Sequence, residues 1–218
     1  MRVIQAVIRY LFRLLYHQFA FAYDIVASIV SLGHWKDWVK SIIPLIQPGA
    51  VLELGFGPGH LQLALLESGI NCYGLDESRQ MNRLASRRLK THGFTNSKLA
   101  RGLASNLPYP SERFETILST FPSEYIFGKL TQEEIHRVLT ENGRLIILPA
   151  VWYRGGRFLE KVMAWLFEVT GETPGVLDLI KDQYKVRMES SRFNVETHLR
   201  ELGSISLLIL IATKQSKP

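Results

Sequence analysis

Three glycines at alternate positions form the clearest candidate site in the sequence. Glu53 is followed by Gly55, Gly57 and Gly59, and a helical run begins at His60. Glycines in this pattern after a strand let the backbone turn sharply and approach a ligand with no Cβ in the way. Amides at the start of the next helix favour a carboxylate or another anion. The pattern predicts a ligand-binding loop at the carboxyl end of a first parallel strand.

Two adenosine cofactors compete for this loop. A dinucleotide prefers Gly-x-Gly-x-x-Gly, whereas position 60 is His60 and the spacing is Gly-x-Gly-x-Gly. Glu53 would repel a pyrophosphate but suits a cationic amine and a sulfonium. Pro58 also removes an amide that a phosphate would use. The loop therefore favours S-adenosylmethionine over a nicotinamide dinucleotide.

A carboxylate at the end of the second predicted strand supports an adenosine ligand. Asp76 follows Gly55 by 21 residues, and a carboxylate at this place accepts hydrogen bonds from both ribose hydroxyls. Asp76 could instead cap the helix that begins near Ser78. The glycine loop at the appropriate distance favours the ribose interpretation.

The elements that must position these residues follow from the hydrophobic pattern. From residue 50, short apolar runs alternate with helical segments, which is typical of a parallel sheet with crossover helices. Parallel strands are predicted over 51–55, 72–76, 98–102, 116–120 and 144–149, and two antiparallel edge strands over 193–199 and 206–213. Helices are predicted over 3–15, 24–31, 35–46, 59–69, 78–92, 131–140 and 157–169.

We therefore expect an α/β, Rossmann-like fold with a mostly parallel seven-stranded sheet and helices on both faces. The expected organisation is an N-terminal helical extension or lid over residues 1–47 and a cofactor-binding domain over residues 48–218.

From about residue 20 to 150 the sequence resembles the class I methyltransferases of small molecules, in particular the branch with ubiquinone and menaquinone C-methyltransferases. The segments that carry the resemblance are 51–59 and 74–81, then 102–104 and 107–110, then 134–139 and 143–145. Upstream, Tyr23 and Trp38 are similar to an N-terminal motif that forms a helical cover in the quinone enzymes. The tryptophans could equally pack the extension onto the sheet.

This resemblance implies the same fold and an S-adenosylmethionine site. Asp76 would hold the ribose and Met81 would pack near the adenine. Many relatives carry an acidic residue where this chain has Leu103, so adenine recognition would depend on backbone groups and apolar packing. With two residues added from their position after the fourth strand, the expected cofactor-binding set is Tyr23, Glu53, Gly55, Phe56, Gly57, Gly59, Asp76, Glu77, Met81, Leu103, Ala104, Thr120 and Phe121.

No residue receives a catalytic role from the sequence. Methyl transfer from a sulfonium is an in-line displacement, so a site mainly has to position the nucleophile and exclude water. A base is needed only for a carbon acid or a hydroxyl. Glu124 and Tyr125 could be a base and its partner, or surface residues at a helix start. His17 could reach the site from the lid, or be structural.

The composition indicates the setting without naming a partner. The 218-residue chain has a net charge of +6, which favours anionic partners. Its single cysteine, Cys72, excludes an internal disulfide, offers no metal-ligand spacing, and is expected in the core. We expect a cytoplasmic protein with no metal and no transmembrane segment, acting on a small acceptor that resembles a quinone or a lipid.

Three alternatives stay open. The N-terminal helix, with Arg2, Arg9 and Arg13 opposite an apolar face, suits the inner surface of an anionic membrane, although that face could be buried core. A nucleic-acid methyltransferase is disfavoured, because the segment from Thr120 to Ser123 lacks an Asn/Asp-Pro-Pro-Tyr/Phe box. A non-catalytic protein that binds the cofactor is the remaining possibility.

Overall fold

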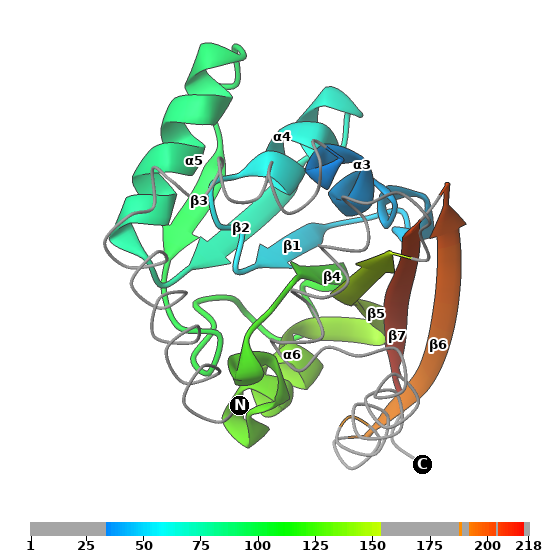
Figure 1. Ribbon diagram of the computed structural model, residues 1–218. Coiled ribbons are helices and arrows are strands. Elements are labelled where there is room, and N and C mark those ends of the chain that lie inside the picture. Colours follow the sequence, from blue (N-terminus) through cyan, green and yellow to red (C-terminus); the bar gives the residue numbers. More distant parts are fainter. Residues whose placement is uncertain (1–33, 154–187, 189–191, 204, 216–218) are drawn as a thin grey trace, which may run out of the picture.

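The computed structural model describes residues 34–153, 188, 192–203 and 205–215, and the fold is that of these residues. They contain a seven-stranded sheet in the order β3-β2-β1-β4-β5-β7-β6 (Figure 1). The strands are β1 Val51–Leu54, β2 Cys72–Asp76, β3 Lys98–Arg101, β4 Phe114–Thr120, β5 Leu139–Tyr153, β6 Phe193–Leu202 and β7 Ile205–Lys214.

Strand direction confirms five parallel strands followed by a hairpin. β1 pairs in parallel with both β2 and β4, whereas β7 is antiparallel to β5 and to β6. The prediction that both hairpin strands lie at the edge is wrong, because β7 lies between β5 and β6. The cause is the almost uninterrupted apolar run of β7, which is buried along its length, while most of β6 is exposed.

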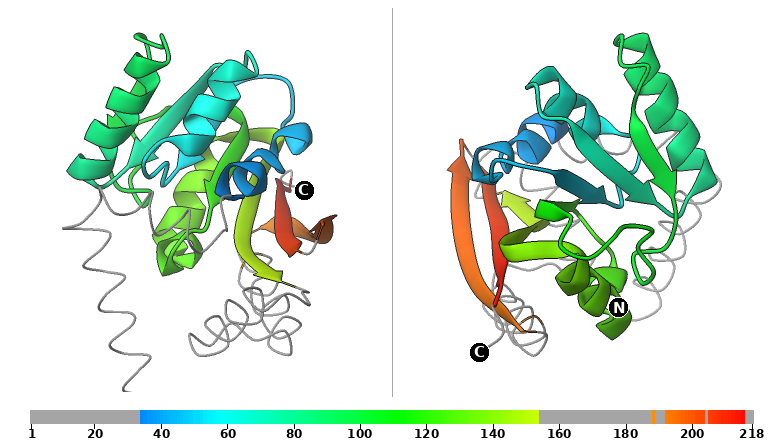
Figure 2. Two further views of the ribbon diagram at one scale, coloured as in Figure 1. Left: turned by 45° about the horizontal axis from the view of Figure 1, so that its top comes forward. Right: turned by 180° about the vertical axis from the view of Figure 1, so that it is seen from behind.

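Helices cover both faces of the sheet, as expected (Figure 2). One face packs against α3 Trp35–Lys40 and α4 His60–Glu67, and the other packs against α6 Lys129–Val138. Side chains of successive β1 residues alternate between these cores: Val51 belongs to the α3/α4 side and Leu52 to the α6 side. α5 Arg79–Thr91 begins after β2, with the Ser78 hydroxyl accepting a hydrogen bond from the Met81 amide as an N-cap.

The predicted helix over 35–46 is interrupted in the structure. α3 ends at Lys40, and a short 3₁₀ helix, η2 Ile43–Leu45, follows. Pro44 accounts for the break, because it has no amide to donate to the carbonyl of Lys40 and so cannot continue the α-helical hydrogen bonds. Trp38, Val39 and Ile42 are nevertheless buried in the core on the α4 side.

The connection from α6 to β5 also differs from prediction. α6 ends at Val138 rather than near residue 140, and β5 already begins at Leu139, which pairs with Phe114 before a bulge shifts the register. The predicted helices over 3–15, 24–31 and 157–169 lie outside the described residues, as do Tyr23 and His17. No helix of the described part is long and apolar enough to cross a membrane.

Candidate functional site

The glycine loop lies at the carboxyl end of β1. This strand lies between β2 and β4, at the point where the order of strands along the sheet changes direction. Gly55, Gly57 and Gly59 all have positive φ, at 69°, 53° and 82°. A Cβ at Gly59 would lie 2.7 Å from the Ala85 Cβ, so this glycine allows the start of α4 to approach α5. A Cβ at Gly57 would meet no atom of the described residues within 4 Å, so the described part of the chain leaves open space beside the loop there. Open space at such a switch point is where doubly wound sheets bind ligands.

Asp76 connects this loop to the start of α5. One carboxylate oxygen accepts a hydrogen bond from the Gly57 amide at 2.9 Å, and the other accepts one from the Ser78 amide at 2.8 Å. The side chain is 2% exposed. Asp76 therefore contacts both the glycine loop and the N-cap residue of α5, while the capping side chain is that of Ser78 and not that of Asp76. The ribose role of Asp76 stays a prediction.

Glu53 points to the α4 side of the sheet and is 1% exposed. Its Oε2 accepts a hydrogen bond from Gln62 Nε2 at 2.8 Å, and the same nitrogen donates to the Tyr73 carbonyl at 3.2 Å. Burial raises the pKa of Glu53 from the usual 4.5 to about 8, with Gln62 opposing the rise and the Asp76 charge adding to it. Glu53 is therefore a buried acid that a cationic ligand would convert to its charged form.

Cys72 completes this buried group. Its Sγ donates to Gln62 Oε1 at 3.0 Å, and burial raises the pKa of the thiol to about 12. A thiol that stays protonated is a poor nucleophile, so the expectation that Cys72 is a core residue is confirmed.

The remaining residues predicted around the adenosine divide into buried and open ones. Phe56 is 3% exposed and its ring lies against Gly74, where an added Cβ would be 2.9 Å from Cδ1. Met81 is fully buried. These two buried side chains pack beneath the glycine loop and the first turn of α5. Glu77 and Leu103, at the ends of β2 and β3, are exposed, Leu103 by 56%.

Two hydrogen bonds to main-chain carbonyls, one from an amide and one from a side chain, hold the ends of β2 and β3 together. The Gly102 amide donates to the Asp76 carbonyl at 3.1 Å, and Arg101 Nε donates to the Glu77 carbonyl at 2.9 Å. Ala104 is half-buried and packs against the core on the α6 side. Both strand ends thus lie at the same edge as the glycine loop.

Tyr125 supports the glycine loop, a role that the sequence did not predict. It lies in η3, Glu124–Phe127, and its hydroxyl donates to the Leu54 carbonyl at 3.2 Å and is 3.2 Å from the Ser119 hydroxyl. A Cβ at Gly55 would be 2.6 Å from this oxygen. Burial keeps the pKa of Tyr125 well above its ordinary value. The hydroxyl is thus suited to holding the loop rather than to acting as a base, and Glu124 beside it is exposed.

Thr120 and Phe121 end the fourth strand beside this support. Thr120 is the half-buried last residue of β4. Phe121 has a φ of 48°, and its amide donates to the Leu148 carbonyl at 2.7 Å. Its ring stacks on Trp35, with centroids 4.5 Å apart and planes inclined by 29°. Phe121 therefore faces α3, and the two partly buried rings form an apolar wall where β4 ends.

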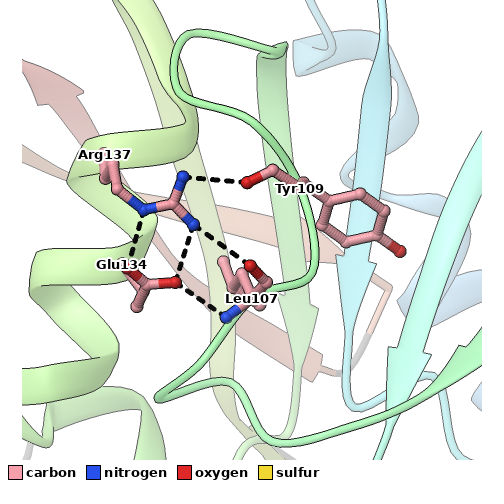
Figure 3. Close-up of polar contacts among 4 residues, drawn as sticks. All are labelled: Leu107, Tyr109, Glu134 and Arg137. Atoms are coloured by element: carbon pink, nitrogen blue, oxygen red, sulfur yellow. Dashed lines mark hydrogen bonds and ion pairs between the residues drawn. The ribbon is translucent and has the colours of Figure 1, made fainter.

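A polar clamp holds the loop between β3 and β4 against α6 (Figure 3). Arg137 donates to both carboxylate oxygens of Glu134, at 2.7 and 2.8 Å, and to the carbonyls of Leu107 and Tyr109, at 3.1 and 2.8 Å. The Leu107 amide donates to Glu134 at 2.7 Å. The Arg137 guanidinium holds the pKa of Glu134 below its usual value. The clamp fixes the loop that begins with Leu103 and Ala104.

Comparison with known proteins agrees with this geometry. Residues 51–143 match the family model described as "Methyltransferase domain". A demethylmenaquinone methyltransferase from Thermotoga maritima is 31% identical over 157 residues, which are 69% of this chain and 66% of that protein. The chain thus spans slightly less than two thirds of this curated relative.

Solved structures share the fold. A putative S-adenosylmethionine-dependent methyltransferase from Methanococcus maripaludis superposes with a TM-score of 0.64 at 16% identity, over 91% of this chain and 93% of that one. The YcgJ protein from Bacillus subtilis gives a TM-score of 0.61 at 14% identity, over 83% of this chain and 99% of that one. With its family match over residues 51–143 and its curated relatives, the chain resembles the S-adenosylmethionine-dependent methyltransferases, whose class I fold it shares.

Proposed function

We propose that this protein transfers a methyl group from S-adenosylmethionine to a small, lipophilic acceptor of quinone-like or lipid-like chemistry. The observation that carries the proposal is the open space at Gly57, bordered by a loop that Asp76 fastens to the start of α5. When bound, the cofactor supplies an electrophilic methyl group on a sulfonium. The task of the protein is to orient the two reactants and to exclude water.

The residues around the loop fit this cofactor. Asp76, at the end of β2 beside the glycine loop, would accept hydrogen bonds from the ribose hydroxyls. Glu53 would supply negative charge for the cationic methionine end, and its ionisation would be favoured by that cation. The exposed Leu103 and the half-buried Ala104 would meet the adenine through apolar contact.

The apolar wall formed by Trp35 and Phe121 supports a lipophilic acceptor. It lies at the end of β4, beside the strand end that carries the glycine loop. Aromatic rings offer large apolar faces that favour stacking with a planar ring. Relatives named demethylmenaquinone methyltransferase share about 30% of their aligned residues with this chain, which is consistent with such an acceptor. A left-handed backbone at Phe121 is also the kind of strain that functional sites retain.

Calorimetric titration with S-adenosylmethionine and S-adenosylhomocysteine tests the cofactor site. Wild-type protein should bind both with dissociation constants in the micromolar range, and Asp76→Ala should weaken binding at least tenfold. Asp37→Ala, an exposed aspartate on α3, is the matched control and should bind like the wild type. Failure of the wild type to bind either nucleotide would refute the proposal.

Methyl transfer is then measured with a demethylated naphthoquinone under reducing conditions, and with phospholipid headgroup analogues. The expected result is a quinol whose mass is greater by one CH2 unit, because the methyl group replaces a hydrogen that leaves as a proton. Tight cofactor binding with no transfer to an acceptor of either class would refute the proposed acceptor chemistry, and the further absence of RNA methylation would favour a non-catalytic cofactor-binding protein. Methylation of RNA in the same assay would establish the nucleic-acid alternative.

A further inference from the structure

α5 carries a concentration of positive charge that the cofactor site does not require. Its thirteen residues include five cations and no acidic residue. The four exposed cations are Arg79, Arg83, Arg87 and Lys90. They are spaced by four, four and three residues, which places them on one face of the helix along about 16 Å. The buried face consists of Met81, Ala85 and Leu89. We call the exposed cations the α5 basic stripe.

The α5 basic stripe has no acidic counterpart within the described residues. None of its four side chains makes a hydrogen bond or an ion pair in that part of the chain, whereas Arg137 and Lys129 each contact a glutamate. Like charges one helical turn apart destabilise a helix slightly. A polyanionic surface would offset this repulsion, and all four cations of the stripe would be attracted to it.

The opposite side of α5 contacts the glycine loop. Ala85 fills the space beside Gly59, and Arg88 donates a hydrogen bond to the Pro58 carbonyl. α5 forms one flank of the molecule next to the edge strand β3 (Figures 1 and 2). A surface that binds the stripe would therefore be separated from the loop by the width of one helix, about 10 Å.

We propose that the α5 basic stripe docks this protein on an anionic membrane surface, with the four cations at the level of the phospholipid headgroups. Attraction to such a surface requires only exposed cations near it and contributes about a fivefold gain in affinity per Lys or Arg. Single-stranded RNA is the less suitable partner, because α5 carries no aromatic side chain on which bases would stack. Docking of this kind depends on charge and position, and it does not depend on the identity of the acceptor.

Co-sedimentation of the full chain with sucrose-loaded vesicles tests the proposal. Binding is expected to vesicles of two parts phosphatidylcholine and one part phosphatidylglycerol at 50 mM NaCl, to weaken at 300 mM NaCl, and to be absent with pure phosphatidylcholine. The double variant R83Q/R87Q should bind about twenty-fivefold more weakly. The control K36Q/K40Q removes the same charge from the exposed face of α3 and should bind as the wild type does.

Three results would overturn the proposal. The first is equal loss in both double variants, which would indicate a response to net charge alone. The second is unchanged vesicle binding by R83Q/R87Q while its melting temperature matches that of the wild type. The third is binding of a single-stranded RNA that depends on the stripe, without stripe-dependent binding to vesicles. Because S-adenosylhomocysteine binding is measured separately, a failure of vesicle binding is distinguishable from a failure of the cofactor site.

Discussion

Replacing Glu53 with Gln should make the protein more stable at alkaline pH while weakening its cofactor site. The folded-state pKa of Glu53 is raised from 4.5 to about 8. The unfolded chain therefore ionises first, and wild-type stability is fully present below pH 4.5 and falls as the pH rises towards 8. A rise of this size corresponds to roughly 5 kcal/mol in total, of which about 3.5 kcal/mol develops between pH 5 and pH 8.

Glu53→Gln removes this ionisation and keeps an oxygen that accepts from Gln62 Nε2. The new amide nitrogen is buried, at a cost of roughly 1–3 kcal/mol. The variant should therefore be less stable than the wild type at pH 5 and more stable at pH 8. Urea unfolding at both values measures this, and the two midpoints should change their order with a relative shift on the order of 1 M.

The difference between wild type and variant isolates Glu53, because other titrating groups contribute equally to both proteins. Glu133→Gln, at an exposed position of α6, is the control and should follow the wild type at both pH values. Parallel stability curves for wild type and Glu53→Gln from pH 5 to pH 8 would refute the reasoning about the buried acid. In addition, wild-type binding of S-adenosylmethionine at pH 7 should release a proton, seen as a binding enthalpy that depends on the buffer.

Three further predictions concern the glycine loop and its support, and a fourth concerns the clamp. Gly59→Ala should lower the free energy of unfolding by about 2 kcal/mol or more, since its Cβ would collide with Ala85 at a positive φ; a thermal unfolding curve like that of the wild type would contradict this. Gly57→Ala adds its Cβ into open space and should cost only about 1 kcal/mol, yet it should weaken S-adenosylhomocysteine binding at least tenfold in calorimetry; unchanged affinity would place the ligand elsewhere. Tyr125→Phe should cost about 1 kcal/mol and weaken cofactor binding severalfold, and a loss of stability with no loss of affinity would limit the hydroxyl to a structural role. Arg137→Lys cannot reproduce the forked contacts of the clamp and should increase protease cleavage of the β3–β4 loop; equal cleavage rates would show that the clamp does not order the loop.

Most of the sheet was predictable because its signals are local. The apolar strands, the glycines between β1 and α4, and Ser78 at the start of α5 each depend on residues close in sequence. The position of β7 was harder to predict from the sequence. Its buried apolar run indicates an interior strand only when it is compared with the polar pattern of β6. Pro44 was a local signal for the break after α3. The helical spacing of the apolar residues on either side of Pro44 nevertheless favoured one continuous helix.

The chemistry of the site was less predictable, because it depends on contacts between distant segments. The partner of Glu53 is Gln62, which reaches it only because α4 crosses that face of the sheet. The loop contact of Tyr125 spans 71 residues to Leu54. The left-handed turn at Phe121 directs its ring onto Trp35, which lies 86 residues earlier in the chain. No periodicity carries information of this kind.

The double hydrogen bond of Asp76 has a dynamic consequence. Because one carboxylate accepts from both Gly57 and Ser78, the two loops that it joins cannot separate without breaking at least one of these bonds. The amide protons of Gly57 and Ser78 should therefore exchange with solvent deuterium as one cooperative unit. A ligand that contacts only the glycine loop would then slow amide exchange at the start of α5 as well. Ligand binding would thus stabilise the glycine loop and the start of α5 together.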